Sequence, residues 1–267
     1  MSHHEAPNAL WIAQRFRGPH RSGNGGYTAG ALAQRLLARS GSGVSTDRAV
    51  CVTLRLPPPL ETPLEVSMVG DDSLRTTTAA GAVIAQAQLV SPLPAAPPPV
   101  SSQTAAQAGK AYRGYVDHPF PFCFSCGTDR AVGDALRLFA GPVPEQAGMT
   151  AALWQPGTSF SRAALDVDAV TEPRMLTAPV VWAALDCPGA WAADFDSGRP
   201  LVLGRMTAVV HHELPADEPY VVVGKCLRQE GRKAFTTTGV YDQDSRLMAA
   251  AEAIWLAVDP ATFAGLQ

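Results

Sequence analysis

The chain has 267 residues, of which 46% are hydrophobic and 17% are charged, so it can build a substantial core as one large domain or two of ordinary size. The formal net charge is −3, and Lys and Arg form no stripe with interleaved aromatic residues, which argues against a nucleic-acid partner. An odd number of cysteines, five, argues against a disulfide framework. We find no cationic and then apolar signal segment and no apolar run approaching ~18 residues. We therefore expect a cytoplasmic protein with no membrane partner.

The first third of the chain has the pattern of a helix followed by several strands. Residues 18–26 form a glycine-rich loop, and the run from Tyr27 to Ala38 contains no proline and is followed by a glycine, which predicts a helix with a glycine stop. From Cys51 to Leu56, apolar and polar residues alternate as in a half-buried strand. Strands are expected at residues 10–17, 51–56, 64–69, 74–78 and 82–89.

A proline-rich segment then divides the chain. Five of the ten residues 91–100 are proline, a composition that favours a stiff, extended backbone. Residues 101–112 predict a short linking helix. We expect the boundary between two halves here.

The second half opens with an aromatic segment at residues 118–127 that contains three Phe and two Cys. Further along, Pro179 predicts the first turn of a helix, where its missing N–H costs nothing. Strands are expected at residues 135–139, 149–154, 203–213, 220–228, 233–241 and 247–258.

One strand pattern occurs twice. Pro215 follows Pro57 by 158 residues, each within a Leu-Pro pair, and the run of three threonines that starts at Thr236 follows the run at Thr76 by 160 residues. An apolar, helix-like run precedes each copy. The repeat predicts two copies of one small α+β unit. A single unit cannot bury its sheet and helix alone, so the two pair, with any site between them.

Three stretches resemble a known family. They are Phe16-Arg17-Gly18 with the following Gly25-Gly26, the apolar run Val180–Asp186, and the closing strands from His211 to Leu247. In order and spacing they resemble the double-hotdog acyl-CoA thioesterases of the thioesterase superfamily, over most of the chain. The resemblance implies an α+β fold of two fused units, each a central helix wrapped by a curved antiparallel sheet. The units would be residues 1–90 and 113–267, the second with a CxxC-containing insert, joined by a linker and short helix at 91–112.

The resemblance also implies an activity in fatty acid metabolism. We expect hydrolysis of an acyl-CoA or acyl-carrier-protein thioester at the interface of the two units, without a cofactor. Two alternatives stay open, a non-catalytic acyl-thioester binding protein and a hydratase or dehydratase acting on acyl thioesters. A hydratase of this fold typically needs a His near the acid, and neither predicted central helix contains one. A homo-oligomer is compatible with the sequence.

Asp186 is the leading catalytic candidate. It is the only acid in the otherwise apolar run from Val180 to Trp191, and burying a carboxylate there costs several kcal/mol unless it is protonated or hydrogen-bonded. A position late in a helix, near exposed carbonyls, would raise its pKa further. The alternative is an acid that caps the following loop. We favour a general base or nucleophile because the resemblance places an acid here.

The segment Asn24-Gly25-Gly26-Tyr27 is the second candidate. Two glycines at a helix start allow backbone N–H groups to approach a ligand closely, and the helix N-terminus favours developing negative charge. These features predict an oxyanion hole, to which the Asn24 side chain can add a donor. A flexible turn explains Gly-Gly equally well.

The remaining polar groups of the family pattern are not clearly present. The resemblance implies a Ser or Thr on the strand after the acid and a Gln on the last strand, and these positions fall near Leu203 and Ala253. Thr207 and Glu252 are the available substitutes, and each is also explained by a structural role.

The segment Cys123-Phe124-Ser125-Cys126 has the spacing of a metal knuckle. A structural zinc needs four ligands, and only His118 lies near in sequence, whereas Cys187 would have to be brought close by the fold. We therefore expect no metal. A tight turn is favoured, in which Phe120, Phe122 and Phe124, together with Trp182 of the helix, line an acyl pocket.

Overall fold

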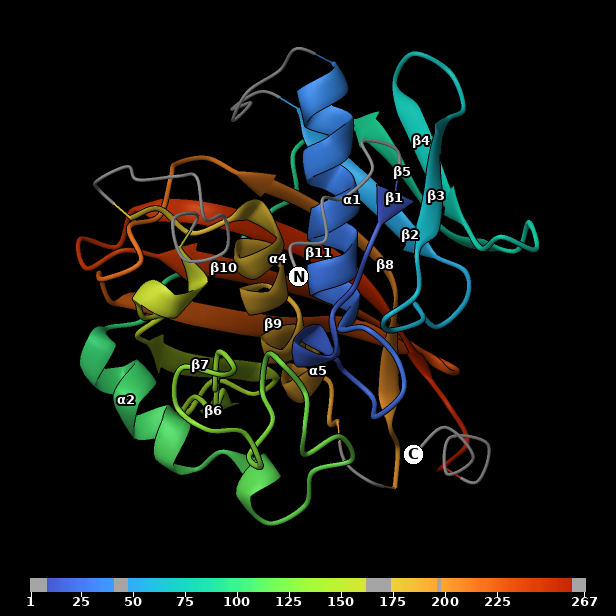
Figure 1. Ribbon diagram of the computed structural model, residues 1–267. Coiled ribbons are helices and arrows are strands. Elements are labelled where there is room, and N and C mark those ends of the chain that lie inside the picture. The colour runs from blue at the N-terminus through green and yellow to red at the C-terminus, as the bar shows by residue number, and fades with distance from the viewer. Residues whose placement is uncertain (1–8, 41–47, 162–173, 196–197, 261–267) are drawn as a thin grey trace.

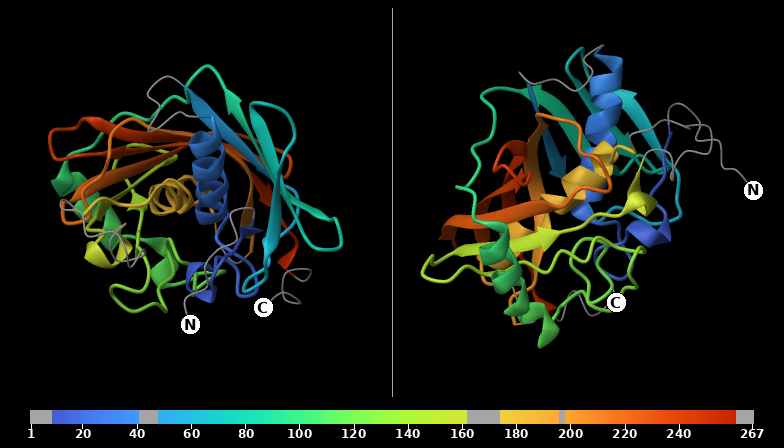
Figure 2. Two further views of the ribbon diagram at one scale, coloured as in Figure 1. Left: turned by 45° about the horizontal axis from the view of Figure 1, so that its top comes forward. Right: turned by 90° about the vertical axis from the view of Figure 1, so that its left-hand side faces the viewer.

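The computed structural model describes residues 9–40, 48–161, 174–195 and 198–260. These residues form one 11-stranded antiparallel sheet in the order β1-β3-β4-β5-β2-β8-β11-β10-β9-β7-β6. The sheet curves around the helices α1 and α4 (Figures 1 and 2).

The helices are α1 (Gly25–Arg39), α2 (Ser102–Lys110), α4 (Ala178–Ala184) and α5 (Cys187–Ala192), with 3-10 turns at Gln14–Phe16, Arg113–Tyr115 and Thr158–Phe160. The strands are β1 (Ala9–Leu10), β2 (Ala49–Leu54), β3 (Leu64–Met68), β4 (Ser73–Thr77), β5 (Val83–Val90), β6 (Gly141–Pro142), β7 (Met149–Trp154), β8 (Leu201–Val210), β9 (Tyr220–Glu230), β10 (Lys233–Tyr241) and β11 (Leu247–Ala257).

The two halves of the sheet repeat one topology. A helix precedes β2 in the first half and β8 in the second, and the strands that follow are ordered β2-β5-β4-β3 and β8-β11-β10-β9. The halves meet where β2 pairs antiparallel with β8, with Val50 opposite Ala208. The strands that carry Thr76 and Thr236, β4 and β10, occupy equivalent places. The sequence repeat thus corresponds to a repeat in strand order.

Helices α1 and α4 approach each other at backbone distance. A Cβ atom built on Gly30 would lie 2.6 Å from the Trp182 Cβ and 2.8 Å from the Pro179 Cα, and one on Gly26 would lie 2.6 Å from the Trp182 carbonyl oxygen. Glycine is required at both positions because any side chain would separate the helices. The contact brings the N-terminus of α1 against the end of α4.

The proline-rich segment 91–100 crosses the outer face of the sheet, opposite the helices. The Ala95 N–H donates to Glu252 of β11 at 3.2 Å, and the hydroxyls of Thr237 and Tyr241 on β10 donate to the carbonyls of Ala95 and Pro97. The segment therefore covers β10 and β11, in the second half of the sheet. The helix expected at 101–112 is confirmed as α2.

Three local predictions differ from the structure. Of the first expected strand, residues 10–17, only Leu10 lies in the sheet, at the end of β1, because Gln14–Phe16 forms a 3-10 turn. The strand expected at 135–139 does not form. Instead, the Leu136 and Leu138 N–H groups donate to the Phe124 and Ser125 carbonyls of the aromatic segment. The helix α1 starts at Gly25, two residues before the predicted start, because Asn24 caps it.

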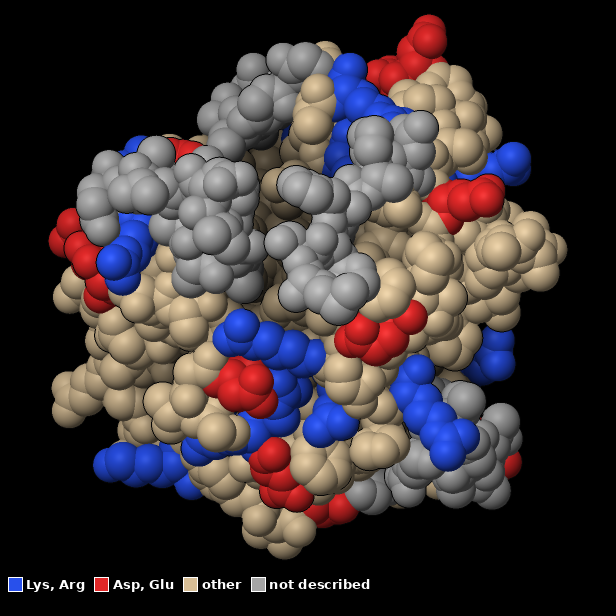
Figure 3. Space-filling model, in the orientation of Figure 1, with Lys and Arg blue, Asp and Glu red and all other residues tan. Residues whose placement is uncertain are grey.

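The exposed face in Figure 3 shows Lys and Arg in small groups interspersed with Asp and Glu. Such a mixed distribution creates no large field of one sign over this face. No helix in the described part of the chain is long and apolar enough to cross a membrane.

Candidate active site

Asp186 lies in the break between α4 and α5. Its backbone (φ −75°, ψ −86°) is outside the helical region, and Pro188 follows two residues later. Pro188 has no N–H to donate to the carbonyl four residues earlier, that of Ala184, so the hydrogen-bond ladder of α4 cannot continue through it. The apolar run is therefore two short helices instead of one. Asp186 is the residue that joins them.

The Asp186 carboxylate is held by the N-terminus of α1. Its Oδ2 accepts hydrogen bonds from the Asn24 Nδ2 at 2.8 Å and from the Gly26 N–H at 3.1 Å. The Asn24 Oδ1 accepts from the Tyr27 N–H at 2.8 Å, which is the N-cap interaction of α1. The same asparagine thus starts the helix and orients the acid.

The pKa of Asp186 is raised to about 7, because burial and, to a smaller extent, the neighbouring Cys123 raise it more than the hydrogen bonds from Gly26 and Asn24 lower it. The residue is 3% exposed. Its Oδ1 is buried and has no hydrogen-bond partner among the described residues. The sequence predicted the direction of this shift but attributed part of it to helix-end carbonyls. Instead, the acid faces the N–H groups at the start of α1, and desolvation dominates.

A cavity of about 280 Å³ reaches Asp186 and lies between the two halves of the sheet. The first half contributes Asn24, Gly25 and Leu54, and the second contributes Leu203 and Trp255. Its walls are mainly apolar side chains and thiols, and the exposed Arg55 and Leu56 are also part of its lining. The site is therefore a mostly apolar cavity that contains one buried carboxylate.

Of the four residues predicted as an oxyanion hole, Asn24 and Gly25 line this cavity, and the donors of the four are used differently from the prediction. The Asn24 side chain and the Gly26 N–H bind Asp186, and the Tyr27 N–H binds Asn24. The Tyr27 ring stacks on Phe16 at 3.9 Å between centroids. The Gly25 N–H has no hydrogen-bond partner among the described residues, and Gly25 lines the cavity.

The four residues predicted to line an acyl pocket lie in four different places. Phe120 lines the cavity. The Arg17 guanidinium lies over the Phe122 ring, 4.6 Å from the centroid of that ring. Phe124 packs edge-on against Phe16 and Phe160. Trp182 is buried against α1. Only Phe120 is positioned to contact an occupant of the cavity.

Thr207 and Glu252 are separated from Asp186. They face each other across β8 and β11, and the neighbours of Thr207 along β8, Met206 and Ala208, point into the core. Side chains alternate between faces along a strand, so Thr207 and Glu252 lie on the outer face, where Glu252 binds the proline-rich segment. The structure thus corrects their assignment to the site of Asp186.

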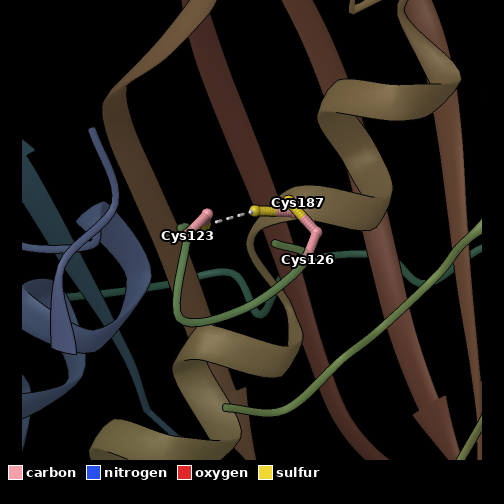
Figure 4. A group of neighbouring side chains, drawn as sticks. All are labelled: Cys123, Cys126 and Cys187. Carbon is pink, nitrogen blue, oxygen red and sulfur yellow. Dashed lines mark hydrogen bonds between the residues drawn. The ribbon is translucent and has the colours of Figure 1, made fainter. Parts of the chain in front are cut away.

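Three cysteines meet beside the acid, which the sequence did not predict. The sulfur atoms of Cys123, Cys126 and Cys187 all lie within 4.8 Å of one another, and all three residues are buried and line the cavity. Figure 4 shows two of them on the loop of the aromatic segment and Cys187 at the start of α5. The CxxC spacing was the available signal, but nothing in the sequence indicated that Cys187 would lie beside it.

No family model and no curated protein matches this sequence. Solved structures, however, match over nearly the whole chain. A protein with a hot dog fold from Alicyclobacillus acidocaldarius is 14% identical, covers 94% of this chain and 93% of its own, and gives a TM-score of 0.55. The acyl-CoA thioesterase II TesB2 from Mycobacterium marinum is 13% identical, with coverages of 95% and 93% and a TM-score of 0.54.

A third match is the dehydratase domain of PpsC from Mycobacterium tuberculosis, solved in complex with C12:1-CoA. It is 14% identical, with coverages of 94% and 92% and a TM-score of 0.57. At such low identity the likeness concerns the fold and carries no activity across. Together with the large antiparallel sheet and its few helices, these matches show that the chain has a hotdog fold.

Proposed function

We propose that this protein is a double hotdog that hydrolyses acyl thioesters in the cavity between its two units. The first unit comprises residues 1–90 and the second unit comprises residues 113–267. Residues 91–112 form the linker between them. The observation that carries the proposal is the position of Asp186, a buried carboxylate that lines an apolar cavity and is oriented through one oxygen by two donors from the other half of the chain.

Asp186 acts as the base in this proposal. With Oδ2 fixed by Asn24 and Gly26, the unpartnered Oδ1 is free to accept a proton from a water molecule that attacks the thioester carbonyl. The negative charge on the carbonyl oxygen then develops at the N-terminus of α1. There the Gly25 N–H is available to donate, and the helix dipole favours the charge.

The cavity favours a thioester with an apolar acyl group. Its volume, about 280 Å³, is near the lower end of ~300–1,000 Å³ for ligand pockets, so it can hold an acyl group but not a whole coenzyme. The Arg55 side chain, exposed and part of the lining, is placed to meet a phosphate of coenzyme A or of a carrier-protein prosthetic group.

A hydratase or dehydratase is the less favoured alternative. Such chemistry on this fold uses a histidine, and no histidine belongs to the described lining of the cavity. His118, the histidine of the aromatic segment, has its Nδ1 bound by the Phe120 N–H and its Nε2 next to the Cys126 carbonyl. The apolar walls are also compatible with a protein that binds acyl thioesters without turnover.

Release of free thiol from a panel of acyl-CoAs, short to long and aromatic, tests the proposal. Wild type and Asp186→Asn are compared, with Thr207→Val as a matched control on the outer face of the sheet. We expect turnover that falls at least ~100-fold in Asp186→Asn, equivalent to ~2.7 kcal/mol of barrier, and that changes less than ~3-fold in Thr207→Val. Turnover that survives in Asp186→Asn would refute Asp186 as the base, and no turnover on any substrate would favour the binding protein.

A further inference from the structure

We propose that Cys123, Cys126 and Cys187 form a zinc site whose fourth coordination position faces the cavity. The three thiols come from two segments that are far apart in the sequence, the aromatic loop and the start of α5 (Figure 4). The other two cysteines, Cys51 and Cys226, lie on β2 and β9 and are partly exposed. The buried thiols are thus concentrated at this one place among the described residues.

The spacing of the sulfur atoms fits a metal ion. Zn²⁺ binds thiolates at about 2.3 Å in tetrahedral geometry, which places two sulfur ligands about 3.8 Å apart. The Cys123 and Cys187 sulfurs are 3.7 Å apart, and the sulfurs of the whole trio lie within 4.8 Å of one another. Three soft thiolates select zinc over hard cations such as Mg²⁺ or Ca²⁺. Only small side-chain movements are needed to close the site around an ion.

The loop that carries Cys123 and Cys126 is rigidly built. The Gly127 N–H donates to the Cys123 carbonyl at 2.9 Å, and a Cβ on Gly127 would lie 2.5 Å from the Pro121 carbonyl oxygen, so only glycine closes this turn. The Ser125 hydroxyl donates to the Ala183 carbonyl at 2.8 Å, which fastens the loop to α4. Metal sites need ligands held in this way by the surrounding structure.

His118 completes the support of this loop and is not the fourth ligand. Its Nδ1 accepts from the Phe120 N–H at 3.0 Å, so in the neutral ring the proton is on Nε2, which lies 3.0 Å from the Cys126 carbonyl and donates to it. Both ring nitrogens are therefore used. The histidine holds the backbone of Cys126 in place.

The fourth position belongs to the cavity. All three cysteines line it, and the three-thiol group does not include Asp186. The Asn24 Nδ2 lies between them, 3.7 Å from the Cys123 sulfur and 2.8 Å from the Asp186 Oδ2. Three protein ligands and an open position are the arrangement of catalytic zinc sites, whereas structural sites are closed by four. Water or a cavity ligand would complete the coordination, within reach of the acid.

The zinc site does not depend on the proposed hydrolysis, so its test measures metal binding directly. Reduced wild-type protein is freed of metal with a chelator and titrated with Co²⁺, which gives a thiolate-to-metal charge-transfer band when cysteines bind it. We expect a band that saturates at one Co²⁺ per chain and disappears when Zn²⁺ is added. A folded wild-type protein that gives no such band would overturn the proposal, whatever its activity.

Cysteine variants identify the ligands. We expect Cys123→Ser, Cys126→Ser and Cys187→Ser to weaken Co²⁺ binding at least ~100-fold, with circular dichroism used to verify that each is folded. Cys226→Ser is the matched control and keeps the band of the wild type. A band that persists in a folded Cys187→Ser variant, or that is lost in Cys226→Ser, would show that the metal binds elsewhere. If the three variants do not fold, the wild-type titration alone decides.

Discussion

The cost of burying the Asp186 charge can be measured with Asp186→Asn. Asparagine has nearly the same shape, and its side-chain oxygen can accept both hydrogen bonds that Asn24 and Gly26 donate to Oδ2. Its amide group then takes the place of Oδ1, which has no partner among the described residues. The substitution therefore removes the ionisable group with little change in packing.

The size of the expected stability loss follows from the pKa of Asp186 in the folded and unfolded states. In the folded protein the pKa of Asp186 is raised from 3.8 to about 7, so folding favours the protonated acid. Below pH 3.8 both states are protonated and the acid has no effect. Between pH 3.8 and 7 the unfolded chain ionises first, and stability falls as the pH rises. Above pH 7 the wild type has lost about 4 kcal/mol of folding stability. The variant has no carboxyl group at this position and does not lose this stability.

Urea unfolding of both proteins at pH 5 and pH 8, with a chelator present, isolates this effect. We expect the stability of Asp186→Asn relative to wild type to increase by about 2–3 kcal/mol between the two pH values. Any constant cost of the asparagine cancels in this comparison. An equal difference at both pH values would refute the reasoning and show that Asp186 is ionised in the folded protein at pH 5.

Two packing predictions concern stability. Gly30→Ala drives a methyl group into Trp182, so we expect a loss of about 1–3 kcal/mol in urea unfolding despite the better helix propensity of alanine. Gln34→Ala, on the exposed side of α1, should stay within about 0.5 kcal/mol of wild type, and equal stabilities of the two variants would contradict the close helix contact. Arg130→Met removes a buried guanidinium that binds the Phe122 and Arg15 carbonyls, and we expect it to cost about 2–4 kcal/mol. Arg48→Met, at an exposed ion pair, should cost less than about 1 kcal/mol, and a similar loss in both would argue that Arg130 does not anchor the aromatic segment.

The elements of the sheet were largely predictable because they depend on local patterns. The alternation of apolar and polar residues from Cys51 to Leu56 matches β2, and the strands expected at 64–69, 149–154 and 233–241 match β3, β7 and β10 closely. The failed strand at 135–139 has a tertiary cause. Its N–H groups bind the aromatic loop, and no local pattern reveals that partner.

The site was predictable where one residue conflicts with its neighbours. Asp186 was selected from the sequence because a carboxylate in an apolar run needs an explanation, and the structure places it, buried, in the lining of the cavity; its catalytic role stays a prediction. Thr207 and Glu252 were misplaced because strand alternation fixes which residues share a face but not which face meets the helices. Cys187 was set aside because its proximity to Cys123 arises from the packing of α5 against a loop some sixty residues earlier in the chain, a contact that only the fold creates.

The central claim is that the cavity beside Asp186 binds the acyl thioester. A crystal structure with an acyl-CoA analogue in which a methylene group replaces the thioester sulfur tests it most directly. We predict the acyl group inside the cavity, with its carbonyl oxygen about 3 Å from the Gly25 N–H and its carbonyl carbon facing the Asp186 Oδ1. An analogue bound elsewhere on the protein, with this cavity unoccupied, would contradict the account.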